Sequence, residues 1–190
     1  MEFCTKLRAT DRRLIQRLAS GTTPGAHRLL SAVEECAEGT KLWCGVSVVM
    51  ALAGGRRGRR AAASALAALT VAQTVSNGLC KHLVRRPRPP KDWVPHDEVE
   101  DRPDSPSFPS GHTAAAAAFT AAVLPVWPLA GVLCAIPAAL VAVERVQSGA
   151  HYPSDVAAGA VIGLGSAWIV RHGPEMAKAR RVHLPATLNV

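Results

Sequence analysis

Long stretches without a charged side chain constrain the fold of this chain more than any other feature of its sequence. The longest covers 113–143, and three shorter ones cover 42–55, 61–80 and 156–170. A helix needs about 20 apolar residues to cross the hydrocarbon core of a bilayer, so two of these runs are short for a span. Because the mean hydropathy is only +0.13, a soluble bundle with Ala-rich core helices is the alternative. The concentration of charge between the runs favours a membrane protein.

Basic residues stand at the ends of these runs. The 190 residues include 22 Lys and Arg against 14 Asp and Glu, a formal net charge of +8. A nucleic acid is one partner that such a charge attracts. The arginines, however, are placed like anchors at an anionic bilayer surface: Arg56, Arg57, Arg59, Arg60 and Arg171. We therefore expect the lipid bilayer, and no nucleic acid, as the partner.

The five cysteines are scattered singly, mostly within apolar stretches. They show neither the spacing of a metal site nor the even number of a disulfide framework. Residues 1–28 lack the apolar segment of a cleavable signal peptide. The sequence therefore predicts no metal site, no cofactor and no cleaved leader.

Three polar blocks lie at the edges of the apolar runs. The middle block, 107–113, reads Ser-Phe-Pro-Ser-Gly-His-Thr and opens the longest run. Backbone N–H groups at the start of a helix bind anions, although an ordinary N-cap at Ser110 is the simpler reading. The outer blocks have a distinct internal spacing: Lys81, six residues, Arg88 and Pro89 in the first, and Arg145, five residues, His151, three residues, Asp155 in the third.

In this order and spacing, the blocks resemble the signature of the type 2 phosphatidic acid phosphatase family, integral-membrane lipid phosphatases related to the vanadium haloperoxidases. The resemblance covers about residues 39–172. It implies that His151 is a nucleophile that forms a phosphohistidine, that Asp155 is its partner and that His112 is the general acid. It also implies a set of phosphate-binding groups: Lys81, Arg88, Ser110, Gly111 and Arg145.

The residue types suit this chemistry. Asp155 follows His151 by one helical turn, a spacing that lets its carboxylate accept the imidazole N–H and point the other nitrogen at phosphorus. Arginine forks and a lysine supply positive charge to phosphate oxygens without a metal ion. A helix cap at Asp155 and interfacial anchors at Lys81 and Arg88 are the simpler alternatives. The two arginines at 85–86 are extra basic groups beside the phosphate site. Attraction of an anionic headgroup is one role for them, and we interpret them as interfacial anchors.

Two positions depart from the family pattern. Glu144 stands where the family commonly has Ser before the Arg of the third block, and Gln147 stands where many relatives have an aromatic residue. A carboxylate beside a phosphate site repels the substrate unless it pairs with Arg145 or another cation.

The resemblance also constrains the run 113–143. As a single helix it would be about 46 Å long and would place His112 and Arg145 on opposite faces of the membrane. Pro125 and Pro128 can break it into a hairpin that returns both ends to one face. The predicted fold is an all-α polytopic membrane bundle of about five transmembrane helices: amphipathic interfacial helices in 1–38, the membrane domain in 39–172 with a basic turn at 56–60 and a loop over the site at 85–108, and a basic tail in 173–190.

The resulting prediction is a membrane phosphatase that hydrolyses a lipid phosphate monoester or diphosphate. Small bacterial members of the family act on phosphatidic acid, phosphatidylglycerol phosphate, polyprenyl diphosphates or polyprenyl-linked sugar phosphates. The alternatives are a non-catalytic lipid-binding or transport protein, and a haloperoxidase-type use of the pocket. Nothing in the sequence selects one lipid or indicates an oligomeric state.

The distribution of charge also predicts which side of the membrane carries the site. The arginines of 56–60 and the basic tail indicate the cytoplasmic face, because short cytoplasmic loops are enriched in Lys and Arg. The three blocks would then lie on the outer face of a bacterial plasma membrane. The six basic residues within 1–28 oppose this assignment.

Overall fold

Helices account for all regular structure in the part of the chain that the computed structural model describes, residues 2–94 and 104–182. This confirms the all-α prediction. The α-helices are α1 Glu2–Gly21, α2 Pro24–Ala37, α3 Lys41–Ala53, α4 Gly55–Gln73, α5 Lys81–Leu83, α6 Gly111–Val123, α7 Pro128–Gln147 and α8 Pro153–Val182. Two short 3-10 helices, Glu38–Thr40 and Lys91–Trp93, and a π-helix, Thr74–Cys80, connect them.

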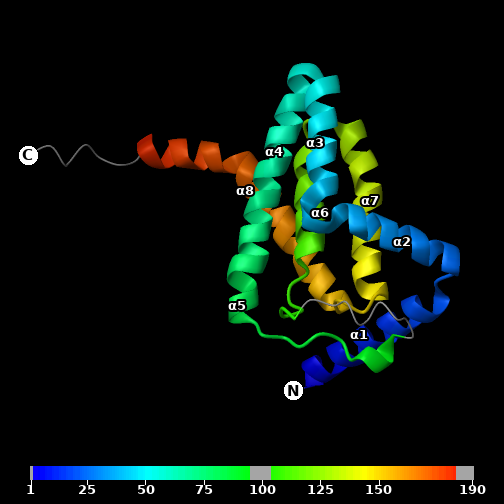
Figure 1. Ribbon diagram of the computed structural model, residues 1–190. Helices are drawn as coiled ribbons and strands as arrows, with labels where there is room; N and C mark the ends of the chain where they lie inside the picture. Colours follow the sequence, from blue (N-terminus) through cyan, green and yellow to red (C-terminus); the bar gives the residue numbers. More distant parts are fainter. Residues whose placement is uncertain (1, 95–103, 183–190) are drawn as a thin grey trace, which may run out of the picture.

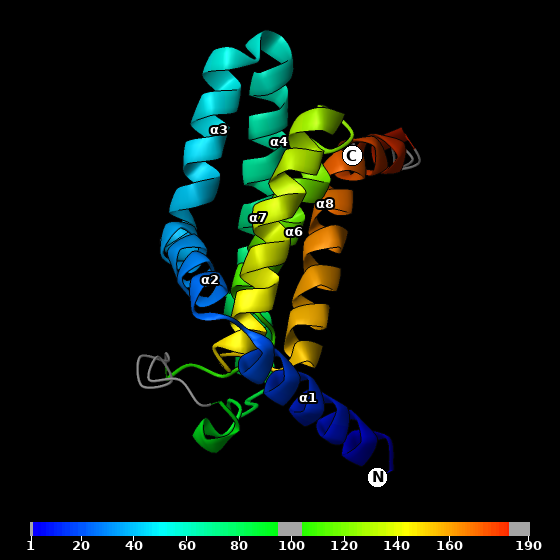
Figure 2. The same ribbon diagram turned by 90° about the vertical axis from the view of Figure 1, so that its right-hand side faces the viewer.

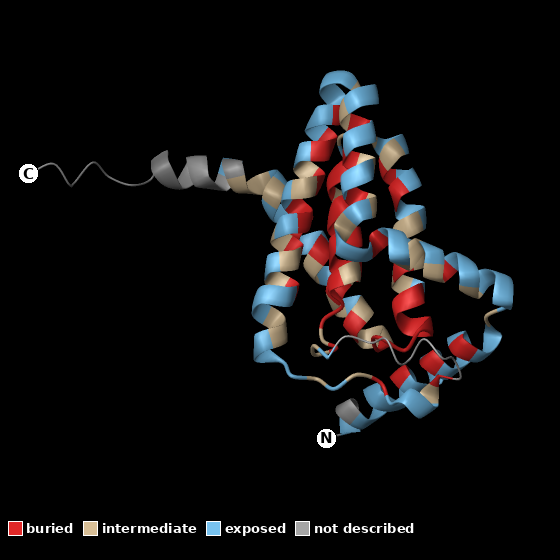
Figure 3. Cartoon of the chain, in the orientation of Figure 1, coloured by how far each residue is buried: buried red, intermediate tan, exposed pale blue. Residues whose placement is uncertain are grey.

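The short helix α6 lies at the centre of the bundle, packed against α4, α7 and α8 (Figures 1 and 3). Most of its residues are alanines, and the buried ones leave room for close helix packing. Its one large side chain, Phe119, contacts the ring of Trp43 on α3, with 5.0 Å between the ring centroids. On α8, a Cβ atom at Gly159 or Gly163 would lie 2.5 Å from a carbonyl oxygen of Ser110 or Ala114. Small residues thus bring the backbones of α6 and α8 into direct contact.

Three helical stretches in the described part of the chain are long and apolar enough to cross a membrane: Pro24–Ala53, Pro128–Gln147 and Pro153–Gly173. Large apolar side chains on their outer surfaces are more than half exposed: Val48, Val49 and Leu52 on α3, Leu129, Val132, Leu133 and Ile136 on α7, and Val161, Leu164 and Trp168 on α8. Such surfaces suit contact with lipid. The predicted count of about five spans is not confirmed, since α6 has only 13 residues and α4 begins with four arginines.

The predicted hairpin in the run 113–143 is present. Helix α6 ends at Val123 and α7 begins at Pro128, whose missing N–H is tolerated at the first helical position. The predicted basic turn at 56–60 is wrong, because these arginines form the first turns of α4. The chain reverses direction just before these arginines, at Gly54 and Gly55. Gly55 has a φ of 55°, a backbone conformation that glycine adopts without strain.

The N-terminal helix α1 lies across the end of the bundle at which α6 and α8 begin (Figure 2). Helix α2 begins at Pro24, and the side chain of Thr23 caps it. The predicted C-terminal tail differs from the structure, because α8 continues as a helix to Val182. Residues 95–103 of the predicted loop and 183–190 of the tail lie outside the described part.

Candidate active site

A cavity of 180 Å³ opens at the end of the bundle where α6 and α8 begin. Six residues singled out from the sequence line it, and they come from all three polar blocks: Lys81, Arg88, Gly111, His112, Arg145 and His151. The break between α6 and α7 makes this possible, because it returns Arg145 to the end of the bundle that holds His112. Two predicted site residues, Ser110 and Asp155, are fully buried behind the cavity and do not line it.

Besides the His112 side chain, the start of α6 contributes backbone to the cavity. The Ser110 hydroxyl accepts a hydrogen bond from the N–H of Thr113 at 3.4 Å, so it caps the helix. Gly111 lines the cavity, and a Cβ atom there would lie 2.6 Å from the Asn77 side chain. A larger residue would therefore displace Asn77 from the cavity wall.

One serine that the sequence did not indicate holds two of the cations. Ser105 Oγ accepts hydrogen bonds from Lys81 Nζ at 3.3 Å and from Arg88 Nη2 at 3.2 Å. Arg88 also donates to the carbonyl oxygens of Ser105 and Ala150, at 3.0 and 2.8 Å. Ser105 stands in irregular chain outside the three blocks, so no spacing could have pointed to it.

Two amides also line the cavity without a signal in the sequence. Gln73 ends α4, and Asn77 lies in the π-helix that follows. Asn77 donates a hydrogen bond to the Gln73 side chain. A π-helix turns less per residue than an α-helix, so it changes which side chains face the cavity, and its position cannot be read from hydrophobic spacing.

Arg145 is held by two carboxylates. Glu144 pairs with its Nε, as required if a carboxylate is to be tolerated at this position, and Glu34 of α2 pairs with its Nη2 at 2.7 Å. The contribution of Glu34 was not predicted. Glu144 and Arg145 are both buried, whereas Glu34 is 31% exposed. Helix α2 is therefore linked to the cavity by the ion pair between Arg145 and the partly exposed carboxylate of Glu34.

The ring of His151 is fixed by a backbone group. Its Nδ1 lies 2.6 Å from the carbonyl oxygen of Ser107 and 3.9 Å from Asp155 Oδ2. The expected hydrogen bond from His151 to Asp155 is therefore replaced by one to Ser107. Because a carbonyl oxygen only accepts, Nδ1 carries the proton and Nε2 has the lone pair.

Asp155 is occupied by other donors. Arg86 Nη1 donates to one of its oxygens at 2.6 Å, and the N–H of Tyr152 donates to the other at 3.0 Å. Interpreting Arg86 as an interfacial anchor was wrong. Its guanidinium bridges Asp155 and Asp11 of α1 and lies 3.8 Å from the centre of the Tyr152 ring.

Burial and neighbouring cations favour the uncharged form of both histidines, because they lower both pKa values. Burial lowers the pKa of His151 well below its ordinary value, and Arg88 and Arg145 lower it further. Burial, followed by Arg145 and Lys81, lowers the pKa of His112 to about 4. A bound phosphate would oppose the effect of the cations and favour a proton on His112.

This arrangement defines a class: a helical membrane protein with two histidines in a small cavity ringed by cations. The chain belongs to the PAP2 superfamily, whose family model matches residues 61–178. The resemblance found in the three polar blocks is thereby confirmed.

Two solved structures share this fold. A PAP2 type phosphatidylglycerolphosphate phosphatase from Bacillus subtilis superposes with a TM-score of 0.71 at 20% identity, over 90% of this chain and 87% of that one. LpxE from Aquifex aeolicus gives a TM-score of 0.67 at 23% identity, over 84% of this chain and 93% of that one. The membrane-type neighbours and the apolar helices together identify an integral membrane protein.

Curated relatives match over shorter stretches. A decaprenylphosphoryl-5-phosphoribose phosphatase of Mycobacterium tuberculosis is 41% identical over 88 residues, 45% of this chain and 46% of the relative. A lipid A 1-phosphatase of Rhizobium etli is 47% identical over 60 residues, 30% of this chain and 25% of the relative. The chain thus matches less than half the length of either relative, and both are named as phosphatases.

Proposed function

We propose that this protein is a membrane phosphatase that hydrolyses a lipid phosphate monoester or diphosphate through a phosphohistidine at His151. One observation carries the proposal: an uncharged imidazole with its lone pair on Nε2 lines a cavity shared with Lys81, Arg88 and Arg145. Phosphoryl transfer is catalysed mainly by positioning and by positive charge around the equatorial oxygens. The cavity provides both.

In the first step, His151 Nε2 attacks phosphorus. The N–P bond forms as the bond from phosphorus to the leaving oxygen breaks, and His112 gives this oxygen a proton. The leaving oxygen is the lipid oxygen of a monoester or the bridging oxygen of a diphosphate. In the second step, the oxygen of a water molecule bonds to phosphorus while this water gives a proton to His112. The N–P bond breaks, inorganic phosphate is released and His151 returns to its starting state.

The cations take the place of a divalent metal ion in this scheme. In the described part of the chain, no group of three or more His, Cys, Asp or Glu side chains could hold a metal. Lys81, Arg88 and Arg145 are instead positioned to neutralise the phosphate oxygens, and the backbone at Gly111 adds the positive end of α6. We therefore propose metal-independent hydrolysis.

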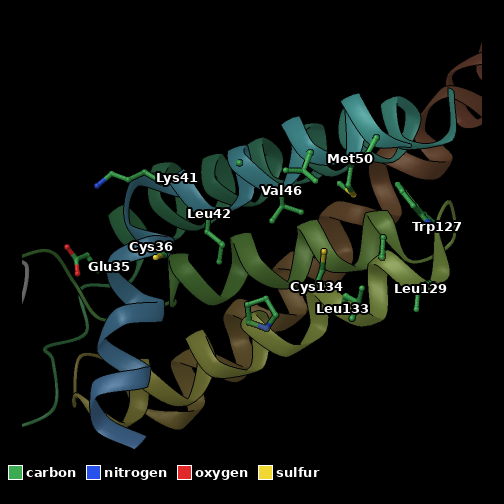
Figure 4. A pocket seen from close by; sticks show the side chains of 15 residues that line it. Glu35, Cys36, Lys41, Leu42, Val46, Met50, Trp127, Leu129, Leu133 and Cys134 are labelled. Carbon is green, nitrogen blue, oxygen red and sulfur yellow. The ribbon is translucent and has the colours of Figure 1, made fainter. Parts of the chain in front are cut away.

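An apolar groove between α3 and α7 suits the lipid chain of the substrate (Figure 4). It has a volume of 1030 Å³ and runs from Glu35 and Cys36 at the α2 end to Trp127 at the far end. Glu35 is adjacent in sequence to Glu34, which pairs with Arg145 in the cavity. The end of α2 therefore contributes both to the groove, through Glu35, and to the partner of Arg145, through Glu34. We propose that the lipid chain of a substrate bound at Arg145 follows this end of α2 into the groove.

The groove can be tested by filling it. Gly45 lines the groove and has no atom within 4 Å of a Cβ position, so Gly45→Leu places its Cβ in open space and adds apolar volume to the groove. We expect Gly45→Leu to raise KM for a long-chain lipid phosphate and to leave KM for a short-chain one within about twofold. Equal effects on both substrates would show that the lipid chain binds elsewhere.

Purified protein in detergent should be assayed for phosphate release from a panel of phosphatidic acid, phosphatidylglycerol phosphate, polyprenyl diphosphate and a polyprenyl-linked sugar phosphate. We expect turnover with at least one of these. It should be lost in His151→Ala and in His112→Ala and kept in His172→Ala, a partly exposed histidine outside the cavity. A labelled phosphoenzyme should accumulate in His112→Ala and be missing in His151→Ala. The opposite pattern would exchange the two roles, and turnover by His151→Ala would refute the mechanism.

A further inference from the structure

The N-terminal helix α1 carries a buried carboxylate on the face that packs against the bundle. Asp11 is 2% exposed, and it stands one and two helical turns before the buried residues Ile15 and Ala19. Burying a carboxylate is costly unless hydrogen bonds and an opposite charge compensate it. An amphipathic helix that only had to lie on a membrane would place this residue on its polar face.

The partners of Asp11 lie beside the candidate active site. Its Oδ1 accepts a hydrogen bond from the backbone N–H of Ser154 at 3.0 Å. Its Oδ2 accepts from the Ser154 hydroxyl at 2.7 Å and from Arg86 Nη2 at 2.9 Å. Ser154 is the second residue of α8, so a carboxylate of α1 satisfies a free N–H at the start of another helix.

Arg86 extends this connection to the histidine turn, which we define as residues 151–155. Its Nη1 donates to Asp155 Oδ1 and to the Ser154 hydroxyl, at 2.6 and 2.8 Å. One guanidinium therefore bridges Asp11 and Asp155. The other oxygen of Asp155 accepts from the Tyr152 N–H at 3.0 Å, and the Tyr152 ring lies under Arg86.

We propose that Asp11 is a positioning residue of the phosphatase site, acting through Ser154 and Arg86 on the turn that carries His151. The proposal rests on the function proposed above and adds a part of the chain that lies outside the family match at 61–178. Asp11 does not line the cavity and touches no reacting atom. It holds the turn from one side, while the Ser107 carbonyl holds the His151 ring from the other.

Such a role changes the rate more than the affinity. In-line attack on phosphorus depends on the distance and angle of Nε2, and a displacement of about 1 Å can cost about 100-fold in rate. The phosphate would be bound by the cationic side chains of Lys81, Arg88 and Arg145, and the hydrogen bonds of Asp11 go to other residues, Ser154 and Arg86. We therefore expect Asp11→Asn to lower kcat about tenfold or more and to leave KM within about twofold.

Two variants separate positioning from mere docking of α1. Ile15→Ala removes buried packing from the same helix without touching the network, so it should lower Tm and leave kcat within about twofold. Arg86→Lys keeps the charge but loses the second arm that bridges the two carboxylates, so it should lower kcat as Asp11→Asn does. The double variant should then be no worse than about the poorer of the two single ones, because both break one network.

A second measurement does not depend on turnover. Histidine-selective ¹⁵N labelling of the full chain in detergent reports the Nδ1–H of His151, assigned by its loss in His151→Gln. We expect this signal to shift or broaden in Asp11→Asn and in Arg86→Lys, and to keep its position in Ile15→Ala.

The outcomes distinguish this proposal from the proposed function. If kcat and the His151 signal are both unchanged in Asp11→Asn, or if kcat falls equally in Ile15→Ala, Asp11 is only part of a docking surface and the positioning role is refuted. If the natural chain hydrolyses no lipid phosphate, the proposed function fails. The shift of the His151 signal in Asp11→Asn then still decides whether Asp11 sets the ring.

Discussion

Glu34 occupies one nitrogen of the Arg145 guanidinium, the group proposed to bind the substrate phosphate. Its carboxylate lies 2.7 Å from Arg145 Nη2, while Glu144 holds Nε of the same guanidinium. If Arg145 binds phosphate as proposed, the substrate has to replace Glu34 at this nitrogen. Glu34→Gln keeps the size of the side chain and removes its charge, so it should strengthen binding and lower KM.

The size of the effect follows from the exposure of the pair. Arg145 is 8% exposed and Glu34 is 31% exposed, so the pair lies between a buried and a surface ion pair. Surface pairs contribute about 0.2–1 kcal/mol, and hydrogen bonds to charged groups contribute about 1.5–3 kcal/mol. We take about 1 kcal/mol for the competition that the substrate overcomes, and this corresponds to about a fivefold lower KM.

The assay is steady-state hydrolysis of a short-chain lipid phosphate in mixed micelles, at low and high salt. Glu2→Gln is the matched control, because it makes the same charge change at an exposed side chain of α1 that pairs with Lys6 and lines neither the cavity nor the groove. KM should fall in Glu34→Gln, less so at high salt, and stay within about twofold in Glu2→Gln. An unchanged or higher KM in Glu34→Gln, or an equal fall in the control, would refute competition at Arg145.

Three further predictions concern metal ions, pH and sidedness. Activity should be complete in excess chelator, and strict dependence on added magnesium would contradict a metal-independent mechanism. Burial, followed by Arg88 and Arg145, lowers the pKa of His151 well below its ordinary value, so we expect an uncharged nucleophile near neutral pH. Burial and the cations lower the pKa of His112 to about 4, and His112 needs a proton to act as the acid, so kcat/KM should fall as pH rises above this value. An acidic limb centred near the ordinary histidine pKa would count against a neutral nucleophile. In a cysteine-free background, an impermeant thiol reagent should label Asp92→Cys in intact cells and Arg59→Cys only after permeabilisation, and the reverse would place the site in the cytoplasm.

The sequence predicted the parts of the site that depend on local spacing. His112 and Arg145 meet in one cavity because Pro125 and Pro128 break the long apolar run, and proline acts on the backbone wherever it stands. The start of α6 followed equally from the cap at Ser110. These are signals that a few neighbouring residues carry by themselves.

The missed contributions join segments that are far apart in sequence. Arg86 meets Asp11 75 positions away, and Arg145 meets Glu34 of α2. Each of these residues belongs to a helix or loop whose charges look like ordinary solvated or interfacial groups. Only the packing of α1 and α2 against the end of the bundle reveals their partners. The partner of His151 could not be predicted either, because its hydrogen bond goes to a backbone carbonyl, and a pattern of side chains does not indicate which carbonyl lies nearby.

The contact between α6 and α8 has a consequence for how a substrate reaches the site. At Gly159 and Gly163 the backbone of α8 lies directly against the carbonyl oxygens of Ser110 and Ala114, so these two positions leave little room for the helices to shift. We therefore expect His112, near the start of α6, and the turn before α8 that carries His151 to keep a fixed separation. Admission of a bulky lipid then has to come from movement on the other side of the cavity, where the attachment of α2 to Arg145 depends on the partly hydrated carboxylate of Glu34.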